Sequence, residues 1–133
     1  MKPSMAGGRA RRAMLRAMIP AAPSVLHVAC LCAGWCRTCD SYRPVFEEAV
    51  AALRAGHPAL RAHWIDIEDE AELVGDYDVE TFPTLVVADA QAVRFAGPLT
   101  PQPETLQRLL RATLADAAPF VSDPAAIAFA TRL

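Results

Sequence analysis

Cys36 and Cys39 are the residues of this sequence best suited to carry out chemistry. They stand three positions apart in the run Trp35–Cys39, directly before a helical pattern. Three positions are close to one helical turn, so the two thiols share a face and can form a disulfide with each other. At the start of a helix, the partial positive charge of the N-terminus stabilises a thiolate over a thiol. The pair therefore indicates either a redox dithiol or two metal ligands.

Two more cysteines keep a metal site open as an alternative. With Cys30 and Cys32, four thiols fall within ten residues, and four thiolates can hold zinc or an iron–sulfur cluster. However, Cys30 and Cys32 belong to a run that we expect to be a buried strand, and the usual pair–loop–pair spacing is missing. We therefore expect both to be inert, buried, small hydrophobic residues, and we expect no metal or cofactor.

Strands and helices alternate around the dithiol. The apolar run 25–32 predicts a buried central strand, and an apolar stripe over 39–55 predicts a helix that Pro44 should kink. The other expected elements are a helix at 9–19, strands at 62–67, 84–88 and 92–96, a short acidic helix at 70–77, a helix from Thr100 and a short helix after Asp123. Such alternation predicts an α/β sandwich with parallel strands and a closing antiparallel hairpin.

Composition and charge narrow the function classes. The chain has 133 residues, 53% of them hydrophobic, which is enough for one domain with a core. Residues 1–16 carry five of the 13 basic residues and none of the 15 acidic ones. A basic tail on an acidic body is not typical of a nucleic-acid binder. We expect no membrane span, because no run of about 18 apolar residues occurs, and we expect a cytoplasmic protein without a signal peptide.

Prolines suggest where the domain begins and ends. Pro20 stops the first helical pattern, and Pro119 stops the last long one. We expect a basic, partly helical N-terminal segment at 1–24, one domain at 25–118, and a C-terminal extension at 119–133 with a possible short helix.

Several residues outside the dithiol resemble the thioredoxin family. The similarity covers roughly residues 25–115 and implies a thioredoxin-like α/β fold, with a central mixed sheet of about four strands flanked by helices. Residues 1–24 are too few for the strand and helix that often begin this fold, so its first strand is expected to be missing. The residues that match the active-site motif, the helix proline, the cis-proline signature and the glycine after the last strand are Trp35, Cys36, Cys39, Pro44, Phe82, Pro83, Thr84 and Gly97.

The resemblance implies a thiol–disulfide oxidoreductase that acts on protein disulfides. Cys36 is then the nucleophile that forms a mixed disulfide, and Cys39 is the resolving thiol that leaves Cys36–Cys39 oxidised. Trp35 would give apolar substrate contact, and the backbone of Phe82, before a cis Pro83, would pair with an extended substrate segment. The remaining substrate-binding residues that we predict are Arg37, Thr38 and Gly97.

Partners and one further alternative follow from the same resemblance. We expect protein disulfides as substrates, and an electron donor such as thioredoxin reductase or a glutathione system. We expect no nucleic-acid partner. The alternative is a binding module with this fold that assists a partner's assembly without turnover.

This chain departs from the family at four points. Arg37-Thr38 stands between the cysteines, where general reductases usually carry Gly-Pro, and Asp40 stands where the family often has Lys. Cys30 occupies the place of a buried aspartate thought to help deprotonate the resolving thiol. A buried cysteine is a poor substitute, because burial opposes its ionisation. Cys32 replaces a tryptophan of the family.

The Arg37 substitution predicts a changed redox potential. A positive charge beside Cys36 favours its thiolate, which stabilises the reduced form and makes the protein more oxidising. The negative charge of Asp40 acts in the opposite direction, because it disfavours the Cys36 thiolate. We expect a potential above the typical thioredoxin value of roughly −270 mV. Equilibration with glutathione buffers, followed by alkylation of free thiols, measures it, and a value at or below that of thioredoxin would contradict the prediction.

Overall fold

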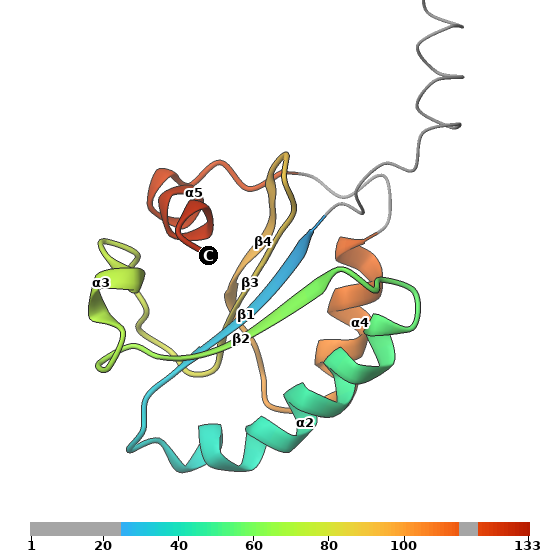
Figure 1. Cartoon of the computed structure of the whole chain (residues 1–133). Coiled ribbons are helices and arrows are strands. Elements are labelled where there is room, and N and C mark those ends of the chain that lie inside the picture. The colour runs from blue at the N-terminus through green and yellow to red at the C-terminus, as the bar shows by residue number, and fades with distance from the viewer. Residues whose placement is uncertain (1–24, 115–119) are drawn as a thin grey trace, which may run out of the picture.

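The computed structural model describes residues 25–114 and 120–133. The expected helix at 9–19, the N-terminal segment 1–24 and the boundary at 118–119 lie outside these residues. Among the described residues, no helix is both long enough and apolar enough to cross a membrane. The elements in chain order are β1 (Leu26–Cys32), α2 (Arg37–Arg54), β2 (Leu60–Asp66), α3 (Ala71–Val74), β3 (Thr84–Ala88), β4 (Val93–Pro98), α4 (Pro103–Thr113) and α5 (Pro124–Thr131) (Figure 1).

The four strands form one mixed sheet with the order β2-β1-β3-β4. β1 runs parallel to β2 and antiparallel to β3, and β3 pairs antiparallel with β4. This confirms the expected mixed sheet of four strands. The hairpin between β3 and β4 is held by Asp89, whose carboxylate accepts hydrogen bonds from the N–H groups of Gln91 and Ala92 at 2.8 and 2.9 Å.

β1 is buried on both faces, which explains its continuous apolar run. Helices α2 and α4 cover one face of the sheet, and α3 and α5 cover the other (Figure 1). Because side chains alternate along a strand, Val28, Cys30 and Cys32 enter the first core, while Ala29 and Leu31 enter the second. A strand with cores on both sides has no room for charged side chains, and its packing against both cores fixes its position.

Helix α2 carries the stripe that the sequence predicted. Its buried residues all face the first core and are Cys39, Tyr42, Phe46, Ala49 and Val50. Cys36 is the residue before the helix, and its carbonyl accepts the N–H of Asp40 at 3.2 Å. Pro44 lies inside the helix, as expected.

Two helices differ in length from the prediction. α3 covers only Ala71–Val74, because Gly75 has a φ of +60°, which residues with a side chain rarely adopt. A Cβ at this position would also contact the guanidinium of Arg132. α4 begins at Pro103 rather than near Thr100, since Pro103 fits the first helical turn, where the missing N–H is not needed.

The C-terminal helix α5 starts where the sequence predicted. The side chain of Asp123 accepts a hydrogen bond from the N–H of Ala125 at 3.1 Å, and Pro124 occupies the first turn. These two features satisfy a free N–H group and fix the backbone angle at the helix start.

α5 packs into the second core. Phe129 is 0% exposed, and its ring stacks on that of Tyr77, with the ring centroids 5.7 Å apart. The Arg132 side chain then donates hydrogen bonds to the carbonyls of Leu73 and Val74 at 2.8 and 3.0 Å. The C-terminal residues therefore complete the face of the sheet that α3 covers only in part.

Replacing Phe129 with Ala should destabilise the whole domain. Loss of a large buried aromatic side chain costs about 3–5 kcal/mol of unfolding free energy. Ile127 on the same helix is 40% exposed, so Ile127→Ala is a matched control that should cost less than about 1 kcal/mol. Urea unfolding followed by tryptophan fluorescence measures both. Equal costs for the two variants would show that α5 does not belong to the cooperative core.

Candidate functional site

The candidate site lies where β1 ends and α2 begins. The N–H of Ile67 donates to the carbonyl of Cys32 at 2.9 Å and fixes the strand end against the chain that leaves β2. The N–H of Cys36 then donates to the carbonyl of Ala33 at 3.0 Å, closing the turn into the helix. This tight connection holds the first turn of α2 against the last residues of the strand.

Gly34 is required inside this turn. A Cβ at position 34 would lie 2.7 Å from Oδ2 of Asp66, a separation shorter than normal contact. Asp66 has little freedom to move away, because its other carboxylate oxygen accepts the N–H groups of Glu68 and Asp69 at 2.9 and 3.3 Å. The absence of a side chain at Gly34 lets the end of β2 approach the site closely.

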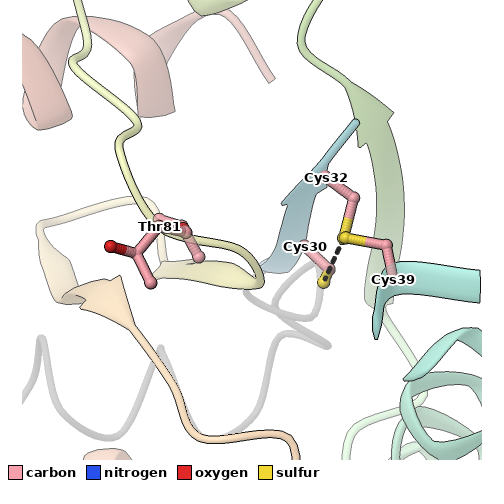
Figure 2. The surroundings of a disulfide bond; sticks show 5 residues. Cys30, Cys32, Cys39 and Thr81 are labelled. Atoms are coloured by element: carbon pink, nitrogen blue, oxygen red, sulfur yellow. Dashed lines mark hydrogen bonds between the residues drawn. A yellow bond between two sulfur atoms is a disulfide. The ribbon is translucent and has the colours of Figure 1, made fainter. Parts of the chain in front are cut away.

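The structure pairs Cys39 with Cys32, not with Cys36. Figure 2 shows this disulfide joining the end of β1 to the start of α2. Its Cα atoms are 5.9 Å apart, within the usual range for disulfides. Cys36 is a free thiol. The expected Cys36–Cys39 bond is thus not the one present, and the expectation that Cys32 is inert is wrong.

The reason for this pairing is the direction of the side chains. Cys32 points to the face of the sheet that α2 covers, and Cys39 is the first buried residue of α2. Both are 2% exposed. The sequence predicted that Cys32 lies in a buried strand and that Cys39 lies at the start of the helix. Their mutual approach depends on how the helix lies on the sheet, which local patterns do not specify.

Cys36 occupies the position just before the helix, in an extended conformation with φ −84° and ψ 115°. It is partly exposed and packs against the edge of the first core. The other free cysteine of the described residues, Cys30, is buried. Cys36 is therefore the free thiol that a large partner can reach, which agrees with the exposed nucleophile that the resemblance implied.

Cys30 cannot act as a base at neutral pH. It is 0% exposed, and burial raises the pKa of its thiol to about 12. Its Sγ lies 4.0 Å from the Sγ of Cys32 (Figure 2). This confirms the expectation that Cys30 does not replace the carboxylate of the family.

Tyr42 is a second buried group near the site. Burial and then the charge of Cys30 raise the pKa of Tyr42, and its hydroxyl has no hydrogen-bond partner in the described part of the chain.

An apolar surface adjoins Cys36. Trp35 is 70% exposed, and its ring meets that of Phe82 edge-on, with the centroids 5.6 Å apart. The peptide bond between Phe82 and Pro83 is cis, as the resemblance implied. The structure thus brings together three of the predicted substrate-binding residues beside the predicted nucleophile.

The other predicted binding residues lie on α2 and β4. Arg37 and Thr38 are exposed in the first turn of α2 and line a shallow depression of about 420 Å³, together with Pro101. Gly97 lies in β4 and pairs with Leu85. Leu85 is near the start of β3, which begins directly after Pro83.

The disulfide also borders a second opening of about 400 Å³, which we call the acidic cleft. Among the described residues, its lining does not include Cys36, Trp35 or Phe82. The acidic cleft and the apolar surface at Trp35 and Phe82 therefore share none of these residues. Besides these two cysteines, the cleft is lined by Ala33, Gly34, Asp40, Arg43, Trp64, Asp66, Asp69 and Glu70.

The four thiols are not arranged as metal ligands. Within residues 25–114 and 120–133, no three His, Cys, Asp or Glu side chains form a group that could hold a metal ion. A histidine pair that sequence spacing did not reveal does occur: Nδ1 of His27 and Nε2 of His63 lie 2.9 Å apart. They stand on adjacent strands, and only the register of β1 with β2 brings them together.

Comparisons with known proteins agree with this geometry. The Thioredoxin family model matches residues 17–111, more than half of the chain. A protein disulfide-isomerase of Hordeum vulgare is 39% identical over 57 residues, which cover 41% of this chain and 11% of that protein. A putative thioredoxin 2 of Streptomyces coelicolor is 33% identical over 66 residues, 50% of this chain and 46% of that protein. The chain thus spans less than half the length of these curated relatives.

Solved structures show the same fold. Human ERp44 superposes with a TM-score of 0.57 at 19% identity, over 68% of this chain and 25% of that one. The germline-specific thioredoxin Deadhead of Drosophila melanogaster superposes with a TM-score of 0.53 at 22% identity, over 75% of this chain and 91% of that one. These matches confirm the predicted thioredoxin-like fold.

The family match spans the sheet, the cysteine motif and the cis proline together, and we conclude that the chain belongs to the thioredoxin family, a family of thiol–disulfide oxidoreductases.

Proposed function

We propose that this protein exchanges disulfides with protein substrates, with Cys36 as the nucleophile and Cys39 as the resolving thiol. The observation that best supports this proposal is the placement of a free, partly exposed Cys36 at the start of α2, one helical turn before a Cys39 that already takes part in a disulfide. Thiol–disulfide exchange needs an accessible thiol, here Cys36, and a second thiol close by that can form a disulfide, here Cys39.

The first step is attack by Cys36. Cys36 lies directly before α2, at the end of the helix where the dipole is positive. The thiolate attacks one sulfur of the substrate disulfide, a bond forms between Cys36 and that sulfur, and the other substrate sulfur leaves as a thiolate that takes a proton from water. The exposed Trp35 and Phe82 rings offer apolar contact to the substrate chain beside this sulfur.

The second step is resolution by reduced Cys39. Its thiolate attacks Sγ of Cys36, and the substrate sulfur leaves as the second thiolate. Cys30 does not accept the Cys39 proton. Burial raises the pKa of Cys30 to about 12, so its thiol is already protonated at neutral pH. The carboxylates of Asp40 and Asp66 line the acidic cleft together with Cys39, and we propose that the proton leaves through this cleft.

An outside electron donor must return the protein to its reduced form. Each cycle consumes two electrons, so a thioredoxin reductase or a glutathione system is the partner that we propose. The chain spans less than half the length of its curated relatives. Protein disulfides as the substrate class are therefore part of the proposal.

A second candidate is a binding module without turnover. The observation in its favour is that Cys39 is bonded to Cys32, which leaves Cys36 without its resolving thiol. A Cys36→Ser variant separates the two functions in a host that depends on this protein. Full retention of the biological role by that variant would favour the binding module over the oxidoreductase.

Replacing Cys39 with Ser should trap substrates. Without the resolving thiol, the mixed disulfide on Cys36 should persist, because its internal attack is removed. We expect covalent adducts on non-reducing gels that disappear on addition of dithiothreitol, and mass spectrometry of the released proteins would identify the substrates.

The matched control is Cys36→Ser, which keeps Cys39 but lacks the accessible nucleophile. It should give no adducts and should lose disulfide reduction of insulin by at least about 100-fold. If the Cys39→Ser protein forms no adduct, or if Cys36→Ser reduces insulin as fast as the native protein, the proposed mechanism is wrong.

A further inference from the structure

The bond that Cys39 makes decides what Cys36 can do. Cys36 precedes it by one helical turn, and Cys32 is bonded to it. While Cys39 is held by Cys32, it cannot resolve a mixed disulfide on Cys36. Building on the function proposed above, we propose that Cys32 is a third redox cysteine that withdraws Cys39 and converts Cys36 from half of an exchanging dithiol into a lone thiol that captures substrates.

The position of Cys32 suits this role. It is the last residue of β1, it points to the face that α2 covers, and its Cα lies 5.9 Å from that of Cys39. Residues at this distance can bond without movement of the backbone. Cys36 stays outside that contact, on the side with the exposed Trp35.

The switch itself is an internal thiol–disulfide exchange. Substrate reduction first leaves Cys36 bonded to Cys39. The Cys32 thiol loses its proton to water, and the thiolate attacks Sγ of Cys39. A Cys32–Cys39 bond forms, the Cys36–Cys39 bond breaks, and its electron pair leaves with Cys36 as a thiolate. The only oxidant needed is the substrate disulfide that was reduced in the preceding turnover.

Burial sets the direction of this exchange. Cys32 is 2% exposed, and a thiolate at a buried site is disfavoured because it loses its hydration. Cys36 is partly exposed at a helix N-terminus, where its thiolate keeps water and meets the helix dipole. The arrangement with Cys36 free is therefore favoured. The same burial slows the attack by Cys32, so the Cys36–Cys39 bond forms first and rearranges later.

In the rearranged protein, a mixed disulfide on Cys36 has no internal thiol to resolve it. Cys36 still attacks a substrate disulfide and releases one substrate thiolate, but Cys39 is occupied. Cys30 is 0% exposed and its pKa is raised to about 12, and its sulfur neighbours Cys32. The adduct on Cys36 then persists until an outside thiol attacks it.

Disulfide mapping of the full chain tests the pairing directly. The reduced protein is oxidised with glutathione disulfide, free thiols are blocked with N-ethylmaleimide at successive times, and the peptides are mapped by mass spectrometry. We expect the final state to contain a Cys32–Cys39 peptide. In Cys32→Ser, Cys39 should instead stay bonded to Cys36. Cys30→Ser is the matched control and should map like the native chain. A native chain that ends as Cys36–Cys39 would overturn the proposal, and this measurement needs no variant.

Adduct formation tests the capture. After the oxidised native chain is freed of small molecules, added glutathione disulfide should leave about one glutathione per chain on Cys36. Oxidised Cys32→Ser should carry close to none, since its Cys36 is already bonded. A Cys32–Cys39 bond without an adduct on Cys36 would overturn the capture role.

The proposed function is tested separately. The reduced native chain and reduced Cys30→Ser should both reduce insulin disulfides. Failure of both would overturn the exchange function, whereas normal reduction together with a final Cys36–Cys39 bond would overturn only the role of Cys32.

Discussion

The packing of the first turn of α2 onto the end of β1 is the contact on which the rest of the site depends. β1 is an interior strand, and its side chains enter the cores on both faces of the sheet, so packing on both sides fixes its position. The turn that follows is short because Gly34 lets Asp66 approach. A rigid strand joined to a helix by a short turn holds the thiols in a fixed geometry, and thiol–disulfide exchange requires such a geometry.

This packing also divides the four cysteines by solvent contact. Cys30, Cys32 and Cys39 lie in the core, while Cys36 lies at its edge. Hydration favours a thiolate, and burial favours a thiol or a disulfide. Cys36 is therefore the one of the four cysteines that a large partner can reach. Of the three buried cysteines, Cys32 and Cys39 are bonded to each other, and Cys30 is a free thiol.

Sequence reasoning predicted the parts of this molecule that local patterns encode. The alternation of strands and helices, the apolar stripe of α2 and the start of α5 at Asp123 follow from periodicity and capping. The sheet of four strands and the accessible Cys36 were implied by the resemblance to the thioredoxin family. The Cys32–Cys39 bond does not, because it joins a strand to a helix whose relative placement is set by the whole core. The contact of His27 with His63 was missed for the same reason, since it depends on the strand register.

Two of the departures from the family motif, Cys30 and Cys32, bear on the same residue, Cys39. A cysteine at position 30 removes the expected buried base, since its own pKa is raised, and resolution by Cys39 should therefore be slow. A cysteine at position 32 gives Cys39 a second partner. Slow resolution lengthens the life of each mixed disulfide, and loss of Cys39 to Cys32 lengthens it further. Both changes act on Cys39 rather than on Cys36, so under the function proposed above they would favour prolonged attachment to substrates over rapid turnover.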